Sequence, residues 1–220
     1  MKKRMVTLGL ALIMMLSLAV PAGAAVTDSR ELALDESVIE MVDKLFNNKE
    51  AYVVLSADAD VTEEFFAKHQ KNYNNENYSI IVNEMLANNL CAISDTETNS
   101  NSRANITYRA SVEIITPFTY RGTAYKAIGK ATVTGEVNDS TGLFQYVNPA
   151  VVGVTNSGVT GATVSGNGYG VELVNGGVRA LQFIKMVVRT SEKTTTRTWR
   201  AVSYPDGGGM TITPISIVES

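Results

Sequence analysis

The sequence predicts an α+β fold in which a short N-terminal helical region packs on or beside an antiparallel β-sandwich or barrel. Between residues 34 and 90, apolar residues recur at three- and four-residue spacing, which is the period of amphipathic helices. From residue 105 onward, apolar and polar residues alternate, as expected of strands with one buried face. This half-buried alternation argues against a parallel, doubly wound sheet, whose strands are apolar on both faces.

Composition divides the chain into four segments. The segment between the helical pattern and the strand pattern is too polar to enter a core, and we predict it to be a linker. The predicted division is a signal peptide over residues 1–24, an acidic helical region over residues 25–93, a polar linker over residues 94–105 and an antiparallel β domain over residues 106–220.

The first 24 residues have the three-part pattern of a secretory signal peptide. A basic start at residues 2–4 precedes an apolar run over residues 6–20, and small residues around Ala24 provide a cleavage site. The run is too short to span a membrane comfortably and ends at helix-breaking Pro21. We therefore expect a secreted, extracellular protein, cleaved near Ala24, with no membrane span in the mature chain.

Three helices are predicted in the acidic region. Ser37 and Glu40 have the spacing of a capping box, and Asp60 is placed to cap the second helix. A β-prone run over residues 51–55 predicts one short strand between the first two helices. The three apolar stripes cover residues 34–46, 61–71 and 78–86.

The β domain is predicted from period-two runs separated by turn residues. Pro149 marks an edge or a bulge within one run. Gly129 and Gly135 lie among alanines, and these small residues predict room for a helix packed on the sheet. The predicted strands lie within residues 105–114, 125–137, 144–154, 159–174, 178–190, 194–204 and 211–218.

Charge is distributed unevenly along the chain. Residues 25–100 contain 15 acidic and 5 basic residues, whereas residues 101–220 contain 7 acidic and 11 basic residues. The two regions have different roles, or they dock on each other, or the acidic residues are ordinary solvated helix surface. Nucleic acid is not an expected partner, because an exported chain with a formal charge of −3 has no recognised binding motif.

The chain contains few of the groups that enzymes and metal sites use. Cys91 and His69 are its only cysteine and histidine, too few for a usual zinc site. We expect Cys91 to be a small buried residue and His69 to face solvent from a helix. Glu113 and Glu136 fall on the polar faces of two candidate strands, which leaves a carboxylate-dependent hydrolase open. We predict no cofactor and no metal.

The preferred function is a secreted, non-catalytic binding or interaction module. Several basic residues of the β half alternate onto one strand face together with the only tryptophan, and such a face suits an envelope component, another extracellular polymer or a protein partner. The alternative is a small-ligand carrier with an apolar barrel lumen, and the hydrolase comes third. The residues predicted to bind the ligand are Lys185, Arg189, Arg197, Trp199 and Arg200.

Overall fold

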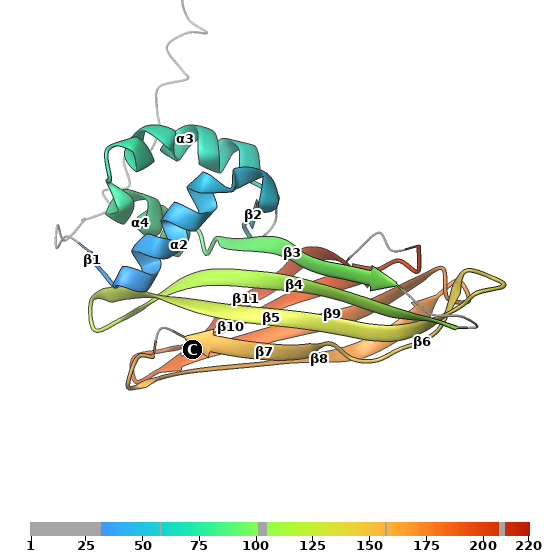
Figure 1. Ribbon diagram of the computed structural model, residues 1–220. Helices are drawn as coiled ribbons and strands as arrows, with labels where there is room; N and C mark the ends of the chain where they lie inside the picture. The colour runs from blue at the N-terminus through green and yellow to red at the C-terminus, as the bar shows by residue number, and fades with distance from the viewer. Residues whose placement is uncertain (1–31, 58, 101–104, 157, 207–209) are drawn as a thin grey trace, which may run out of the picture. The chain divides into compact units, whose positions relative to one another are not determined.

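The computed structural model describes residues 32–57, 59–100, 105–156, 158–206 and 210–220. Within them the protein is mostly β with a mixed α+β content, comprising three α-helices and eleven strands (Figure 1). The predicted signal peptide and its cleavage site lie outside these residues. Among the helices of the described ranges, none has both the length and the apolar character needed to cross a membrane.

The strands form two sheets. One consists of β1 (Ala33–Leu34), β2 (Val53–Leu55), β3 (Cys91–Ser100), β4 (Asn105–Tyr120), β5 (Thr123–Asn138), β6 (Leu143–Val147) and β7 (Val151–Asn156). The other consists of β8 (Ala162–Val174), β9 (Arg179–Thr190), β10 (Thr194–Ser203) and β11 (Met210–Glu219).

The two sheets differ in the order of their strands but share antiparallel pairing. The seven-stranded sheet has the order β1-β5-β4-β3-β2, with β6 and β7 also paired to β5, and the four-stranded sheet has the order β11-β10-β9-β8. All of these pairings are antiparallel except that of β1 with β5. The predicted runs over residues 178–190 and 194–204 form the antiparallel pair of β9 and β10. The run predicted over residues 144–154 forms two strands, β6 and β7, which both pair with β5, and Pro149 lies between them.

The inner faces of the two sheets share one hydrophobic core. Val112 and Ile114 of β4 belong to the same buried cluster as Ile184 of β9 and Trp199 of β10. Gly129 of β5 faces this core, and a Cβ atom there would lie 3.0 Å from the sulfur of Met186. The predicted room for a helix at Gly129 is therefore wrong, because the small residue makes room for a side chain of the second sheet.

Helices α2 (Glu36–Asn47), α3 (Thr62–Asn74) and α4 (Tyr78–Ala87) match the three predicted stripes. Asp35 caps α2, and its Oδ1 accepts a hydrogen bond of 3.0 Å from the backbone N–H of Ser37. The predicted capping box is therefore wrong, because the cap lies two residues before Ser37. At α3, Asp60 Oδ1 accepts a hydrogen bond of 2.9 Å from the N–H of Thr62, the kind of contact expected of a capping aspartate.

A second buried cluster contains residues of all three helices and of the seven-stranded sheet. Val42 of α2 and Ile81 of α4 belong to it, together with Ile115 of β4. The backbone N–H of Asp35 also donates to the carbonyl of Ala124 on β5, at 3.0 Å. The apolar stripes of the helices are thus buried, as their period requires.

The segment predicted as a linker over residues 94–105 contains strand instead. β3 continues to Ser100 and pairs with β4, so that Ser100 lies opposite Tyr108. β2 pairs with β3 in turn, so part of the predicted helical region belongs to the sheet. The linker was predicted because the side chains of this segment are polar. The prediction is wrong because strands pair through backbone N–H and C=O groups, which these residues have whatever their side chains.

Candidate binding face of the four-stranded sheet

The five residues predicted to bind a ligand lie on opposite faces of the four-stranded sheet. Arg197 and Trp199 point inward and are only 6% and 2% exposed. Lys185, Arg189 and Arg200 occupy the outward positions of β9 and β10, and both arginines there are exposed. The prediction of one shared face is wrong, because consecutive residues of a strand, such as Trp199 and Arg200, point to opposite sides.

The outward-facing side chains of β8, β9, β10 and β11 form a surface that we call the outer face. A row of register partners crosses it, from Tyr169 through Phe183 and Arg200 to Thr213. The rings of Tyr169 and Phe183 are stacked, with centroids 5.4 Å apart and planes inclined by 27°. Tyr169 is 42% exposed, so this ring pair is an accessible aromatic platform.

Four basic side chains share the outer face with this platform. Arg179, Lys185 and Arg189 lie at outward positions of β9, and Arg200 lies opposite Phe183 on β10. None of the four has a carboxylate within ion-pair distance among the described residues. With Glu172 of β8 as the acid on the same face, the positive charges outnumber the negative and give the face a positive potential.

Hydroxyl and amide groups occupy many of the remaining outward positions. These groups can both donate and accept hydrogen bonds, which suits a ligand rich in hydroxyl groups. They belong to Thr163, Ser165, Asn167, Thr194, Thr196, Thr198, Thr211 and Thr213.

Sequence reasoning missed the two aromatic residues of the outer face. Phe183 has the same strand parity as the predicted Lys185, so the alternation of β9 alone would have found it. Tyr169 lies in a glycine-rich run, which indicates bulges and bends rather than a binding face. Its pairing with Phe183 depends on a register that only the folded sheet defines.

The two carboxylates considered for a hydrolase do not meet. Glu113 lies opposite Lys130 on β5, and Glu136 lies six residues further along that strand, about 20 Å away at the rise of a β-strand. Glycosidase carboxyl pairs are separated by about 5–10 Å. Each acid also has another partner: Glu113 lies 3.0 Å from Lys44 Nζ, and Glu136 accepts a hydrogen bond of 2.9 Å from the Tyr146 hydroxyl. The register therefore contradicts this acid pair.

The only histidine does not face solvent. His69 on α3 is 1% exposed, and its Nε2 lies 3.0 Å from Glu84 Oε2. The prediction of a solvent-facing histidine is wrong, because His69 packs on the same side of the helix as Phe65, with ring centroids 5.1 Å apart. Among the described residues, no group of three or more His, Cys, Asp or Glu side chains is placed to hold a metal ion.

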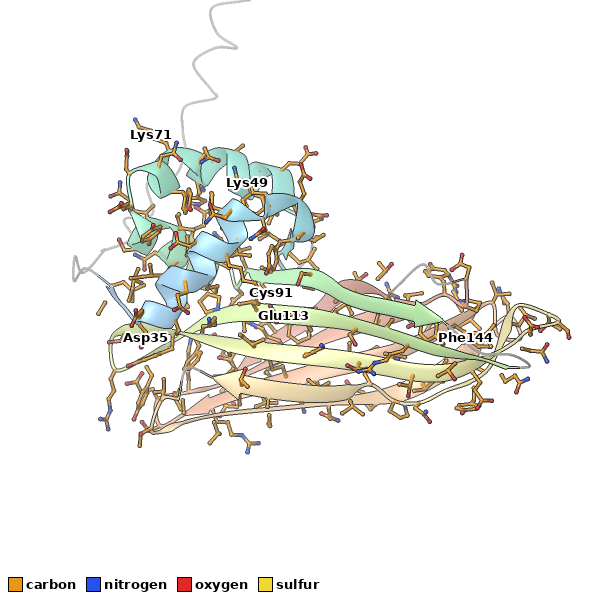
Figure 2. The ribbon with its side chains drawn as sticks, viewed as in Figure 1. Asp35, Lys49, Lys71, Cys91, Glu113 and Phe144 are labelled. Atoms are coloured by element: carbon orange, nitrogen blue, oxygen red, sulfur yellow. The ribbon has the colours of Figure 1, made fainter. Side chains whose placement is uncertain are left out.

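Cys91 lies at the start of β3 (Figure 2) and is 3% exposed, which confirms the prediction of a buried thiol. Burial raises the pKa of this thiol, and Arg197 and Trp199 lower it by less. We expect Cys91 to react with Ellman's reagent more than tenfold more slowly in the native protein than in guanidinium, because the thiolate is the reactive form. Complete modification at equal rates in both states would contradict the buried position.

The comparisons with known proteins add nothing to this surface. No protein-family model matches the chain, and no curated protein or solved structure is significantly similar to it.

Proposed function

We propose that the protein is a secreted, non-catalytic binding module whose outer face holds an anionic extracellular polymer, such as an acidic polysaccharide of an envelope. The observation that carries the proposal is the stacked pair of Tyr169 and Phe183 beside Arg200 and Lys185, neither of which has an ion-pair partner in the part of the chain that the structure describes. The signal-peptide pattern of the first 24 residues supports the extracellular location.

The outer face offers two kinds of contact that an acidic sugar needs. The rings of Tyr169 and Phe183 present apolar area at low entropic cost, against which the C–H face of a sugar can pack. The guanidinium of Arg200 offers paired N–H donors, a geometry that matches a carboxylate. A ring pair next to such a cation therefore favours a sugar that carries a negative charge.

The spacing along β9 favours a polymer over a single sugar. Phe183, Lys185 and Arg189 lie on one side of the strand, so their Cα atoms are separated by about 7 Å and then about 13 Å. A chain with regularly repeated carboxylates can contact several of these groups at once. Each further contact is then intramolecular, which strengthens weak individual interactions.

Substitutions on the outer face test the proposal. We expect Tyr169→Ala and Arg200→Ala each to weaken retention on immobilised polygalacturonate about tenfold, since central aromatic and arginine contacts dominate binding energies. Retention should also fall as salt rises, because exposed charges are screened. Binding constants of the protein expressed from its full sequence, measured at low and high salt, check both expectations.

Matched controls lie on the seven-stranded sheet. Tyr146→Ala removes an aromatic side chain that is 44% exposed, and Lys130→Ala removes an exposed cation of β5. Neither change should alter retention. Equal losses from Tyr146→Ala and Tyr169→Ala would contradict the outer face as the binding surface.

A groove favours the small-ligand carrier as a second candidate. It has a volume of about 600 Å³ and is lined by apolar residues of β2, β3 and β11, such as Val53, Ile93 and Ile212, and by Glu50 and Asp60 at its rim. It lies at the edge strands of the two sheets rather than in a barrel lumen, since the space between the sheets is filled by core side chains. Ile212→Ala should leave polymer retention unchanged if the outer face is the site, and should abolish uptake of an apolar dye if the groove is.

A further inference from the structure

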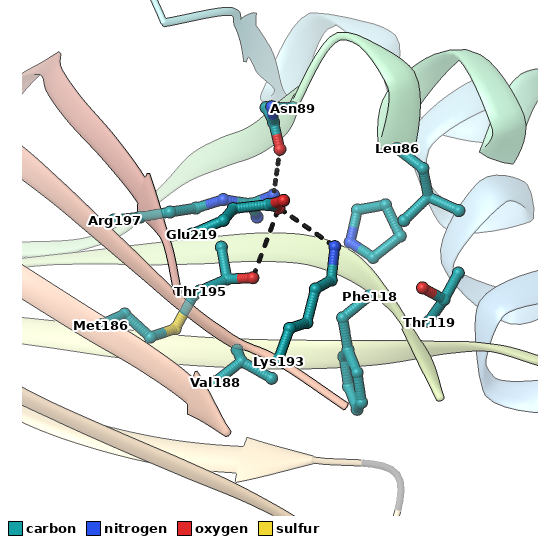
Figure 3. A pocket seen from close by; sticks show the side chains of 11 residues that line it. Leu86, Asn89, Phe118, Thr119, Met186, Val188, Lys193, Thr195, Arg197 and Glu219 are labelled. Atoms are coloured by element: carbon teal, nitrogen blue, oxygen red, sulfur yellow. Dashed lines mark hydrogen bonds and ion pairs between the residues drawn. The ribbon is translucent and has the colours of Figure 1, made fainter. Parts of the chain in front are cut away.

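A small cavity lies on the inner side of the four-stranded sheet, away from the outer face. Its volume is about 70 Å³, and eleven residues from α4, β4, β9, β10, β11 and the connections between them line it (Figure 3). About 10–15 Å³ on this measure accommodates one water molecule, so the cavity has room for a small ion.

Arg197 is the buried cation of this cavity. Its side chain extends from β10 toward Asn89, whose Oδ1 accepts one hydrogen bond from Nη2 at the long distance of 3.5 Å. Nε is buried and has no hydrogen-bond partner within the described ranges. A guanidinium carries five N–H donors, so most of its hydrogen-bonding capacity is unused among the described residues.

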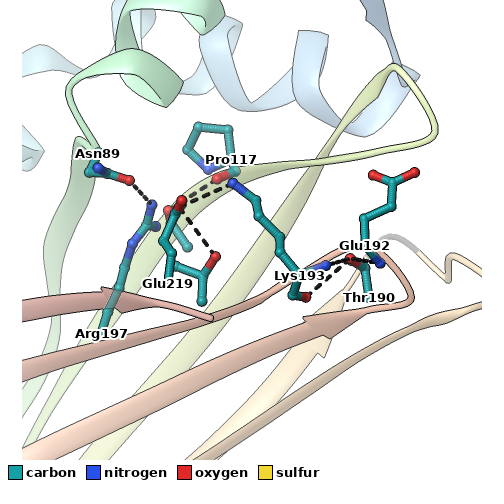
Figure 4. A network of polar contacts seen from close by, with 9 residues as sticks. Asn89, Pro117, Thr190, Glu192, Lys193, Arg197 and Glu219 are labelled. Carbon is teal, nitrogen blue, oxygen red and sulfur yellow. Dashed lines mark hydrogen bonds and ion pairs between the residues drawn. The ribbon is translucent and has the colours of Figure 1, made fainter.

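The other charges of the cavity compensate one another (Figure 4). Lys193 Nζ lies 3.1 Å from Glu219 Oε1, which also accepts a hydrogen bond of 3.5 Å from the Thr195 hydroxyl. No described carboxylate lies within ion-pair distance of Arg197. The neighbouring Cys91 stays a neutral thiol, because burial raises its pKa. Glu219 attracts Arg197 as well as Lys193, so these two cations share one carboxylate and the cavity keeps a net positive charge.

An unpaired buried charge is unfavourable, because the protein does not replace the water that the ion has lost. We propose that this cavity binds a small monovalent carboxylate, with Arg197 as the charged donor and Asn89 at its edge. A planar guanidinium matches a planar carboxylate, and the single negative charge of the carboxylate balances the net positive charge of the cavity. A ligand of acetate size is the class that the volume admits.

Acetate is the probe for this site. We expect acetate to raise the melting temperature saturably at constant ionic strength, relative to chloride, while neutral acetamide of the same shape has no effect. Arg197→Met should raise the apparent Kd for acetate at least about tenfold, because the charged partner is removed. Lys185→Met, on the outer face, should leave the Kd unchanged.

Glu219→Gln keeps the proposal testable if Arg197→Met fails to fold. Glu219 is half exposed, and its carboxylate repels an incoming anion. Replacing it by the neutral amide should tighten acetate binding several-fold, whereas a purely structural role of this residue predicts no gain. An acetate response equal to that of chloride in both the wild type and Glu219→Gln would overturn the proposal, and so would an unchanged Kd in a folded Arg197→Met variant.

Discussion

Replacing Trp199 by alanine is expected to lower the free energy of unfolding by about 3–5 kcal/mol. Trp199 is 2% exposed and belongs to the core that the two sheets share. Its removal opens a cavity between the sheets, because strands that are fixed by their ladders cannot collapse onto the space. The loss is a large part of the total stability of a typical domain, about 5–15 kcal/mol.

Urea denaturation monitored by far-UV circular dichroism measures this effect. Val151→Ala is the control, since Val151 is 74% exposed on β7 and its truncation should change stability by less than about 0.5 kcal/mol. A Trp199→Ala variant as stable as Val151→Ala would show that the inner face of β10 is not packed against the other sheet.

Replacing Gly168 by alanine is expected to destabilise the protein by about 3 kcal/mol. A Cβ atom at this position of β8 would lie 2.6 Å from both the backbone N and the backbone O of Ala150. The N–H of Gly168 also donates to the carbonyl of Ala150 at 3.0 Å. The added methyl group would therefore push apart two backbones that are bonded to each other, with no flexible side chain able to yield.

Gly153→Ala on β7 is the matched control for this substitution. The nearest atom to a Cβ there is the carbonyl oxygen of Lys130 at 4.0 Å, and neither glycine has a positive φ. We expect Gly153→Ala to be neutral or slightly stabilising, since alanine restricts the unfolded chain. Equal denaturation midpoints for the two variants would contradict the close approach of β8 to the backbone of Ala150, the residue before β7.

The elements whose signal is local were predictable from the sequence. The three helices lie where the apolar stripes predicted them, because a helix with one buried face carries apolar residues with a period of 3.6. The hairpin of β9 and β10 follows from alternation on both sides of the turn at residues 191–193. At β3 the same reasoning failed, because polar side chains hide a strand that is held by backbone pairing with β4.

The candidate sites depend on contacts that no local pattern encodes. The outer face requires the register that places Tyr169 beside Phe183. The cavity requires Asn89 to meet Arg197, and 108 residues separate them along the chain. The basic composition of the β half predicts that cations gather there. Which of them are buried depends on the face of the strand, and Arg197 and Arg200, three residues apart on β10, point to opposite faces.

A map of backbone amide shifts during titration with polygalacturonate oligomers tests the outer face most directly. We predict salt-sensitive shifts centred on Tyr169, Phe183 and Arg200, with little change along β4 and β5. Shifts confined to the seven-stranded sheet or to the groove between β2 and β11 would contradict the outer face as the binding surface of this protein.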